Sequence, residues 1–201
     1  TKFALILNPD TTLQESTIWN FFKIINDIPD FAIIGPYAQE SKDENIEEQL
    51  KYKLVNNVKG FAMFLNITEF NKVGFFDESF FIYFEEIDLC KRLISNNKKI
   101  YLVPSIKINH IGGQSHNIDI NEKMELSRNW HWMWSTFNYQ KKYNGFFIAL
   151  LLVMPKLFSS ILRFFFYTLI FNFKKRNIYY QRFSGLWNAI LGKSSWYRPD
   201  V

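Results

Sequence analysis

Acidic and aromatic residues are interspersed in one short segment, residues 75–92 (FFDESFFIYFEEIDLCKR), which contains no Pro and no Gly. Carboxylates favour solvent and aromatic rings favour the core, so a segment with both commonly places carboxylates at the edge of a partly dry site. Burial there raises carboxylate pKa values, which suits acid–base chemistry. An amphipathic helix with a charged, solvated outer face is the alternative, and this segment alone leaves the two about equally open.

A second polar group, Asn8-Pro9-Asp10, directly follows the apolar run FALIL at residues 3–7. The run has the length of a buried strand, and Pro9 ends it. Ligands of α/β sheets bind at open strand ends, so Asp10 lies where a metal or phosphate site could form. A plain Asx turn is the simpler interpretation of the same residues.

His110 ends another apolar stretch and precedes the glycine-containing loop 111–116. A lone histidine at a strand end is more often structural than metal-binding, although His is the commonest metal ligand. His110 is therefore a metal-ligand candidate only in combination with other residues.

The elements that would position these residues alternate between strands and helices. Strand-like runs cover residues 3–7, 31–36, 60–65, 100–104 and 106–110. Thr12 and Glu15 read as a capping box ahead of an apolar helical face, and Thr68 reads as the cap of a short helix at 69–73. This alternation predicts an α/β fold with a mixed, largely parallel sheet and flanking helices.

The helix within the acidic segment has two faces. Glu85, Asp88 and Arg92 lie three and four residues apart, so they share one face, and Asp88 can pair with Arg92. Leu89 lies on the apolar face, and Glu86 is expected between the two. Glu86 is thus placed at the border of core and solvent.

Composition narrows the class of protein. The single cysteine, Cys90, excludes an intramolecular disulfide framework and a four-cysteine zinc site. Residues 141–201 hold ten Lys or Arg and one acid, which gives +9, so residues 1–140 carry −4 of the net +5. A basic, apolar tail on an acidic body suggests an anionic partner, either a membrane or a nucleic acid.

Residues 146–171 are almost wholly apolar and would form a helix about 39 Å long, enough to span a bilayer. We expect Pro155 to interrupt this helix and leave halves too short to span. The polar residues form one stripe, the pattern of a helix that lies in the membrane interface: Lys156, Ser159, Ser160, Arg163 and Tyr167.

Flanking residues favour the same interpretation. Lys174-Lys175-Arg176 suits anionic headgroups, and aromatic residues could sit at the interfacial level: Trp130, Trp132, Trp134 and Tyr139. A soluble hairpin of two buried helices is the alternative, and we favour membrane contact. The cations are not interleaved along a groove, so we expect no nucleic-acid partner.

Taken in order and at these distances, the polar residues resemble family 2 glycosyltransferases of the GT-A fold, nearest to the rhamnosyltransferase-like branch that builds bacterial surface polysaccharides. The resemblance covers about residues 3–116. The residues that carry it are Asn8-Pro9-Asp10, Gly60, Phe76-Asp77-Glu78, Phe81, Glu85 to Leu89, Arg92, Pro104, His110, Gly112, Gly113 and Ser115.

The resemblance implies roles for these residues. Asn8 and Asp10 would bind the donor's diphosphate, with Asp10 holding the Mg²⁺ or Mn²⁺ that bridges it, and His110 would complete that metal site. Glu86 would be the general base, with Glu85 and Asp88 as the alternatives. The acceptor side would include Gly60, Asp77, Arg92, Gly113 and Ser115.

The implied protein has part of a nucleotide-diphospho-sugar transferase (GT-A) domain at residues 1–125 and a helical, membrane-associated region at 126–201. It would be an inverting hexosyl- or rhamnosyltransferase at the cytoplasmic face of a bacterial inner membrane. Its partners would be a nucleotide-sugar donor, a saccharide or lipid-linked saccharide acceptor and the anionic membrane surface.

Three departures from the family pattern qualify this expectation. Asn8 stands where many members have Asp, and Glu86 stands where the base is usually Asp. The N-terminal half that holds the nucleotide base is expected to be missing, so we expect no turnover by these 201 residues alone. The alternative is a truncated or degenerate relative that binds a saccharide or docks on a membrane without catalysis.

Overall fold

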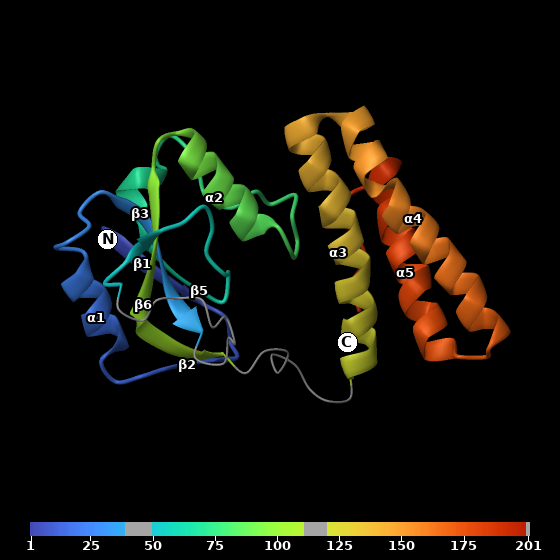
Figure 1. The fold of residues 1–201 in the computed structure, drawn as a ribbon, viewed down its shortest axis with the longest axis horizontal. Helices are drawn as coiled ribbons and strands as arrows, with labels where there is room; N and C mark the ends of the chain where they lie inside the picture. Colours follow the sequence, from blue (N-terminus) through green and yellow to red (C-terminus); the bar gives the residue numbers. More distant parts are fainter. Residues whose placement is uncertain (39–49, 111–119, 200–201) are drawn as a thin grey trace. The chain divides into compact units, whose positions relative to one another are not determined.

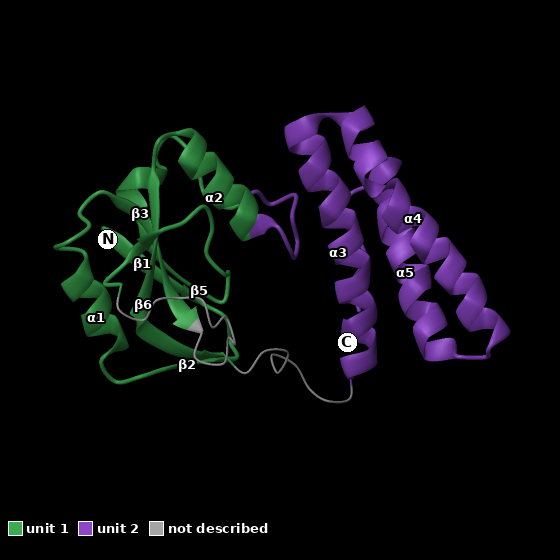
Figure 2. Ribbon diagram, viewed as in Figure 1, with its two compact units in different colours: residues 1–76, 86–116 green, residues 77–85, 117–201 purple. Residues whose placement is uncertain are grey.

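The computed structural model describes residues 1–38, 50–110 and 120–199, and the chain divides into two compact units (Figure 2). Unit 1 contains residues 1–76 and 86–116, and unit 2 contains residues 77–85 and 117–201. The functional division near residue 125, with a catalytic domain before it and a membrane-associated region after it, stays a prediction.

Unit 1 is built on a mixed six-stranded sheet (Figure 1). Its strand order is β1 (Phe3–Leu7), β5 (Ala62–Asn66), β3 (Phe31–Ala38), β6 (Lys99–His110) and β2 (Thr11–Leu13), with β4 (Lys53–Leu54) also paired to β6. Among the described strands only β3 and β6 pair in parallel. The α/β class with a mixed sheet is confirmed, but the largely parallel pairing was wrong. An apolar run in the sequence indicates that a strand is buried but does not indicate its direction relative to its neighbours.

Two local helix predictions in unit 1 were also wrong. Thr12 lies in β2, opposite Asn109 of β6, and helix α1 (Thr17–Ile24) starts only after Ser16. The backbone of Thr12 is paired with β6, so this residue is part of the sheet and not of a helix cap. Thr68 lies within a short 3₁₀ turn, η1 (Ile67–Phe70), and does not cap a helix.

Alternate residues of the central strands face two different cores. Phe64 of β5 packs in the core that contains Phe21 of α1, and their rings stack with centroids 4.8 Å apart. Met63, the preceding residue, packs in the core that contains Leu89 of α2 (Glu85–Ser95). Helices therefore cover both faces of the sheet, which explains why β5 is buried at every position.

Unit 2 is a bundle of three helices: α3 (Asn121–Asn144), α4 (Phe146–Leu169) and α5 (Phe173–Ile190). Trp130 of α3 is fully buried at its centre. Gly185 of α5 lies against the Trp130 backbone, because a Cβ at Gly185 would come within 2.2 Å of the Trp130 carbonyl oxygen. Glycine at this position is what allows α3 and α5 to approach so closely.

Trp130 and Trp134 are core residues, so the prediction that they sit at a membrane interface was wrong. Their indole N–H groups donate to Ser184 Oγ at 3.3 Å and to the Lys193 carbonyl at 2.9 Å. The two residues are one helical turn apart and share the face of α3 that packs on the other helices. Trp132, between them, is 42% exposed.

Helix α4 continues through Pro155, so the predicted interruption is also wrong. Pro155 lies on the exposed side of the helix, where a kink displaces few packed neighbours. Among the described residues, α4 is the one helix that is long and apolar enough to cross a membrane by length and composition. The predicted division of α4 into two short halves is absent, so Pro155 gives no argument against a membrane-spanning α4.

His131 lies on the buried side of α3, and its Nε2 is 2.7 Å from the carbonyl oxygen of Tyr197. Burial lowers the pKa of His131 to about 4, the Tyr197 carbonyl opposes this, and the charge of Arg198 adds to the lowering. The ring is therefore neutral at neutral pH and donates its Nε2 proton to Tyr197.

We predict that unit 2 loses stability as the pH falls from 6.5 toward 4. The unfolded chain takes up a proton near pH 6.5, whereas folded His131 does so near 4, so the free energy of unfolding falls by about 3 kcal/mol across this window. His131→Gln keeps a donor for Tyr197 but does not titrate. Thermal melts from pH 4 to 8 should show a flatter slope for this variant, and identical slopes would contradict the assignment.

Candidate active site

Asp10 and His110 lie side by side because of strand pairing. Thr11, at the start of β2, pairs with His110 at the end of β6, and this register places Asp10 beside the histidine. Asp10 Oδ1 is 3.4 Å from His110 Nε2. The Asp10 side chain is 4% exposed and that of His110 is 26% exposed, so the pair is shielded yet open on the histidine side.

The turn before β2 is fixed by Asn8. The Asn8 N–H donates to the Phe61 carbonyl at 2.8 Å, and the Asn8 carbonyl accepts from Thr11 through its N–H at 3.2 Å and its Oγ1 at 2.7 Å. These bonds involve the Asn8 backbone, so Asn8 shapes the turn that carries Asp10. The predicted contact of Asn8 with a donor diphosphate stays a prediction.

Phe61 is a site residue that the sequence analysis did not identify. Its ring stacks on the imidazole of His110, with centroids 4.8 Å apart and planes 12° apart. The stack fixes the plane of the imidazole and covers one of its faces. No local signal in the sequence relates Phe61 to His110, which lies 49 positions later.

Glu86 occupies the second position of α2, where backbone N–H groups are free to bind a carboxylate. Burial raises the pKa of Glu86, and hydrogen bonds from its own backbone N–H and that of Ile87 partly offset the effect. A carboxylate that is partly dry and has a raised pKa is suited to accept a proton near neutral pH.

Gly60 lies directly beside Glu86. A Cβ at Gly60 would be 3.4 Å from Glu86 Cγ, so a larger side chain there would press on the glutamate stem. Gly60 and Phe61 are consecutive in the chain, and the first lies beside Glu86 while the ring of the second stacks on His110. The predicted base and the predicted metal side thus each neighbour one of two consecutive residues of unit 1.

The donor set at Asp10 and His110 fits a divalent ion that takes few ligands from protein. No group of three His, Cys, Asp or Glu residues that could hold a metal occurs in the described part of the chain. Mg²⁺ commonly uses one or two carboxylates and completes its shell with phosphate and water, while an imidazole ligand favours Mn²⁺ over Mg²⁺. The pair fits an ion shared with a phosphate ligand better than a closed structural zinc site.

Asp88 and Arg92 form an internal brace. The Asp88 carboxylate is fully buried and accepts from Arg92 Nε at 2.8 Å. The Arg92 guanidinium also donates to the carbonyls of Val73, at 2.7 Å, and Phe75. The predicted pairing is confirmed, and these bonds favour a bracing role over the catalytic and acceptor-side roles suggested for the two residues.

Two further site candidates belong to unit 2. Asp77 accepts from Lys142 Nζ at 2.6 Å and from the Ser79 N–H at 3.0 Å. Partial burial disfavours ionisation of Asp77, but these bonds outweigh it and lower its pKa to about 2. Glu85 opens α2 but is grouped with unit 2, so the chain passes between the units at the Glu85–Glu86 peptide.

The remaining acceptor-side candidates, Gly113 and Ser115, lie outside the described residues. Their roles stay predictions.

No protein-family model matches the chain. A curated relative does. The chain is 25% identical over 118 residues to the low-salt glycan biosynthesis hexosyltransferase Agl10 of Haloferax volcanii. The match covers 48% of this chain and 38% of that protein, so the chain spans well under half of the length of its relative. The chain is therefore similar to a glycosyltransferase.

We predict that Arg92→Met lowers the free energy of unfolding by about 3 kcal/mol, because it leaves the Asp88 carboxylate buried without its cation. The double variant Asp88→Leu/Arg92→Met leaves no buried charge and should recover part of that loss. Urea denaturation measures both. Simple additivity of the two substitutions would show that the buried charge is not the cause.

We predict that Glu86→Gln stabilises unit 1 above the pKa of Glu86. The raised pKa means that the folded state binds the Glu86 proton more tightly than the unfolded state. The free energy of unfolding of the wild-type protein therefore falls as the pH rises above 4.5, the ordinary pKa of a glutamate. Thermal melts at pH 4 to 8 should show a gain for Glu86→Gln that disappears at low pH. A gain that is independent of pH, or a loss, would contradict the desolvation.

Proposed function

We propose that this chain is part of a metal-dependent glycosyltransferase that moves a sugar from a nucleotide-sugar donor to a saccharide acceptor. The observation that supports this most directly is that consecutive residues neighbour both parts of the candidate site: Gly60 lies beside Glu86, and the Phe61 ring stacks on His110, which lies beside Asp10. Similarity to the hexosyltransferase Agl10 adds independent support. Membership of family 2 and of its rhamnosyltransferase-like branch is part of the proposal.

Glu86 is the proposed general base. Its carboxylate takes the proton of the acceptor hydroxyl as the oxygen forms a bond to the anomeric carbon, and the bond from that carbon to the donor diphosphate breaks. Attack from the face opposite the leaving group inverts the anomeric configuration. Because burial raises the pKa of Glu86, its carboxylate is a stronger base than an ordinary, solvated glutamate.

Asp10 and His110 would hold the Mg²⁺ or Mn²⁺ ion. When bound, the ion supplies positive charge to the departing nucleoside diphosphate. Phe61 keeps the His110 imidazole in one plane, and the Asn8 turn keeps Asp10 at its side. These residues pre-position the ligands, which limits the reorganisation needed when donor and ion bind.

We further propose that unit 2 associates with a membrane and that the acceptor is lipid-linked. Helix α4 buries one face against the bundle, while its outward face is apolar and exposed. Four residues illustrate that face: Phe147 is 80% exposed, Leu151 72%, Leu162 69% and Leu169 77%. An exposed apolar face of this extent favours lipid as its environment. A site at the cytoplasmic face of the membrane suits a soluble nucleotide-sugar donor.

The product would enter a surface glycan. The sequence resemblance pointed to bacterial polysaccharides, whereas the similar relative belongs to glycan biosynthesis in Haloferax volcanii. The proposal is therefore glycan assembly at a membrane, with a hexose or a 6-deoxyhexose as the donor sugar. A non-catalytic saccharide- or membrane-binding relative is the alternative, and it differs in retaining binding without transfer.

We predict that Glu86→Gln lowers kcat by about 10²- to 10⁴-fold in the complete protein that carries these residues, because the acceptor hydroxyl loses its base. Release of nucleoside diphosphate from UDP-hexoses and dTDP-rhamnose, in the presence of Mn²⁺, measures turnover. Glu15→Gln, an exposed carboxylate of the same unit, serves as the control and should leave turnover unchanged.

The metal side has a separate readout. We expect Mn²⁺ binding to be weakened by Asp10→Asn and by His110→Gln. Electron paramagnetic resonance, with and without UDP, measures this binding. Near-normal turnover in both Asp10→Asn and Glu86→Gln would overturn the assignment of these two residues to the metal site and the general base. Binding of donor or saccharide without any turnover by the wild-type protein would favour the non-catalytic alternative.

A further inference from the structure

Three cations gather on two stacked tyrosine rings in the hairpin of α4 and α5. The rings of Tyr167 and Tyr179 stack with centroids 5.4 Å apart and planes 12° apart. The guanidinium carbons of Arg163 and Arg182 each lie 5.3 Å from the Tyr179 centroid, and Lys175 Nζ lies 5.4 Å from the Tyr167 centroid. We call Arg163, Lys175 and Arg182 the cationic cluster.

Neutral groups accept the hydrogen bonds of the two arginines in this cluster. Arg163 Nη1 donates to the Tyr179 hydroxyl at 2.7 Å, and Arg182 Nε donates to Asn129 Oδ1 at 2.7 Å. Within the described ranges, none of the three cations forms an ion pair with a carboxylate. Like charges held close together repel, so the cluster favours an anion from outside the chain.

The start of α5 adds to the positive potential. Its first turn contains Lys174, Lys175 and Arg176 and no acidic residue, although the N-terminus of a helix already carries partial positive charge. Lys174 lies 3.4 Å from Glu125, which accounts for one of these charges. The sequence thus places cations where the helix dipole disfavours them, and a bound anion would relieve that conflict.

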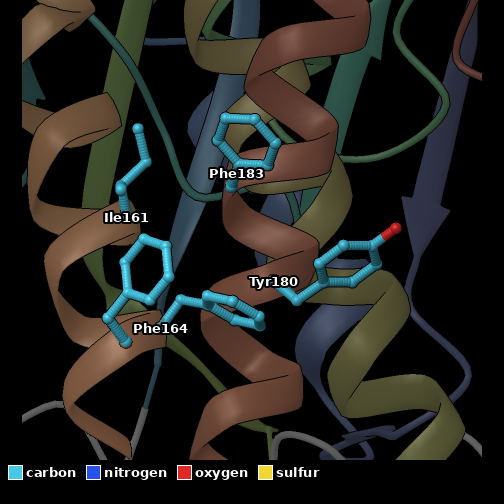
Figure 3. Close-up of a pocket in the computed structure, with 5 residues that line it drawn as sticks. Ile161, Phe164, Tyr180 and Phe183 are labelled. Atoms are coloured by element: carbon cyan, nitrogen blue, oxygen red, sulfur yellow. The ribbon is translucent and has the colours of Figure 1, made fainter. Parts of the chain in front are cut away.

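An apolar groove lies on the same turns of the same two helices. It has a volume of about 290 Å³ and is lined by Ile161, Phe164, Phe165, Tyr180 and Phe183. Figure 3 shows Ile161 and Phe164 on one helix and Tyr180 and Phe183 on the other. Phe164 directly follows Arg163, and Tyr180 directly follows Tyr179, so the groove and the cationic cluster occupy neighbouring faces of one hairpin.

We infer that this hairpin binds an anionic membrane lipid, with the lipid phosphate on the cationic cluster and an acyl chain in the groove. Guanidinium groups match phosphate oxygens with paired N–H donors, and both arginines keep donors beyond those already engaged. The exposed apolar face of α4 would place the hairpin at the bilayer surface, where such lipids are found. The inference rests on the membrane part of the proposed function and is independent of sugar transfer.

The test is flotation of the 201-residue protein with vesicles of phosphatidylcholine alone or with 30% phosphatidylglycerol. Arg163→Gln/Arg182→Gln removes two cations of the cluster and should weaken binding to the phosphatidylglycerol vesicles about 30-fold, from about a fivefold effect for each cation. The matched control, Lys141→Gln/Lys193→Gln, removes two exposed cations of unit 2 outside the cluster and should weaken binding less than threefold. Circular dichroism confirms that both variants fold.

Three outcomes of the vesicle experiments would overturn the lipid site. Equal losses for the two double variants would overturn the site and leave only a diffuse charge effect. Displacement of the protein from vesicles by 10 mM inorganic phosphate would show a free-phosphate site and overturn the lipid assignment. Absence of vesicle binding by the wild-type protein would overturn both the lipid site and the membrane proposal, while the Glu86 and Asp10 assays of transfer would be unaffected.

Phe164→Ser tests the groove separately, because it introduces a hydroxyl where an acyl chain would lie. Because the acyl chain would lose its apolar contact, binding of this variant to phosphatidylglycerol vesicles should weaken even though the cationic cluster is intact. Unchanged binding would show that the groove does not receive the chain.

Discussion

The burial of the central strands on both faces is the constraint on which unit 1 depends. Every residue of β5 is buried, and successive residues enter cores that belong to different helices, α1 for Phe64 and α2 for Met63. A shift of one residue would exchange the two sets, so the register is strongly fixed. The same strand fixes the peptide that precedes it, Gly60–Phe61, and through it the positions of Glu86 and His110.

The candidate site combines groups that are held by quite different means. Asp10 and His110 are held by strand register and by a ring stack, so their separation depends on the sheet. Glu86 is held by the start of α2, which the buried pair of Asp88 and Arg92 secures to the preceding loop. Helix α2 and the sheet share the core that contains Leu89 and Met63, which fixes the start of α2 relative to the strands.

Unit 2 has an aromatic interior, an exposed apolar face and a group of cations in separate places on one bundle. Its interior is aromatic, with Trp130 closely packed on Gly185, while residues such as Leu151 are exposed on the outward face of α4. Between these two faces lie cations that stack on Tyr179 and lack carboxylate partners in the described chain. Interior, apolar surface and anion-attracting surface are thus different parts of one three-helix bundle.

The sequence alone determined the buried runs, the α/β class, the pairing of Asp88 with Arg92 and the polar residues worth testing. Those features depend on local spacing and on hydrophobic periodicity. Strand direction, the place of Thr12 in a strand and the burial of Trp130 were decided by tertiary structure, because distant backbone groups and packing partners outweighed local signals. The contact of Phe61 with His110 also required the fold, since residues 49 positions apart in the chain meet only after the sheet has assembled.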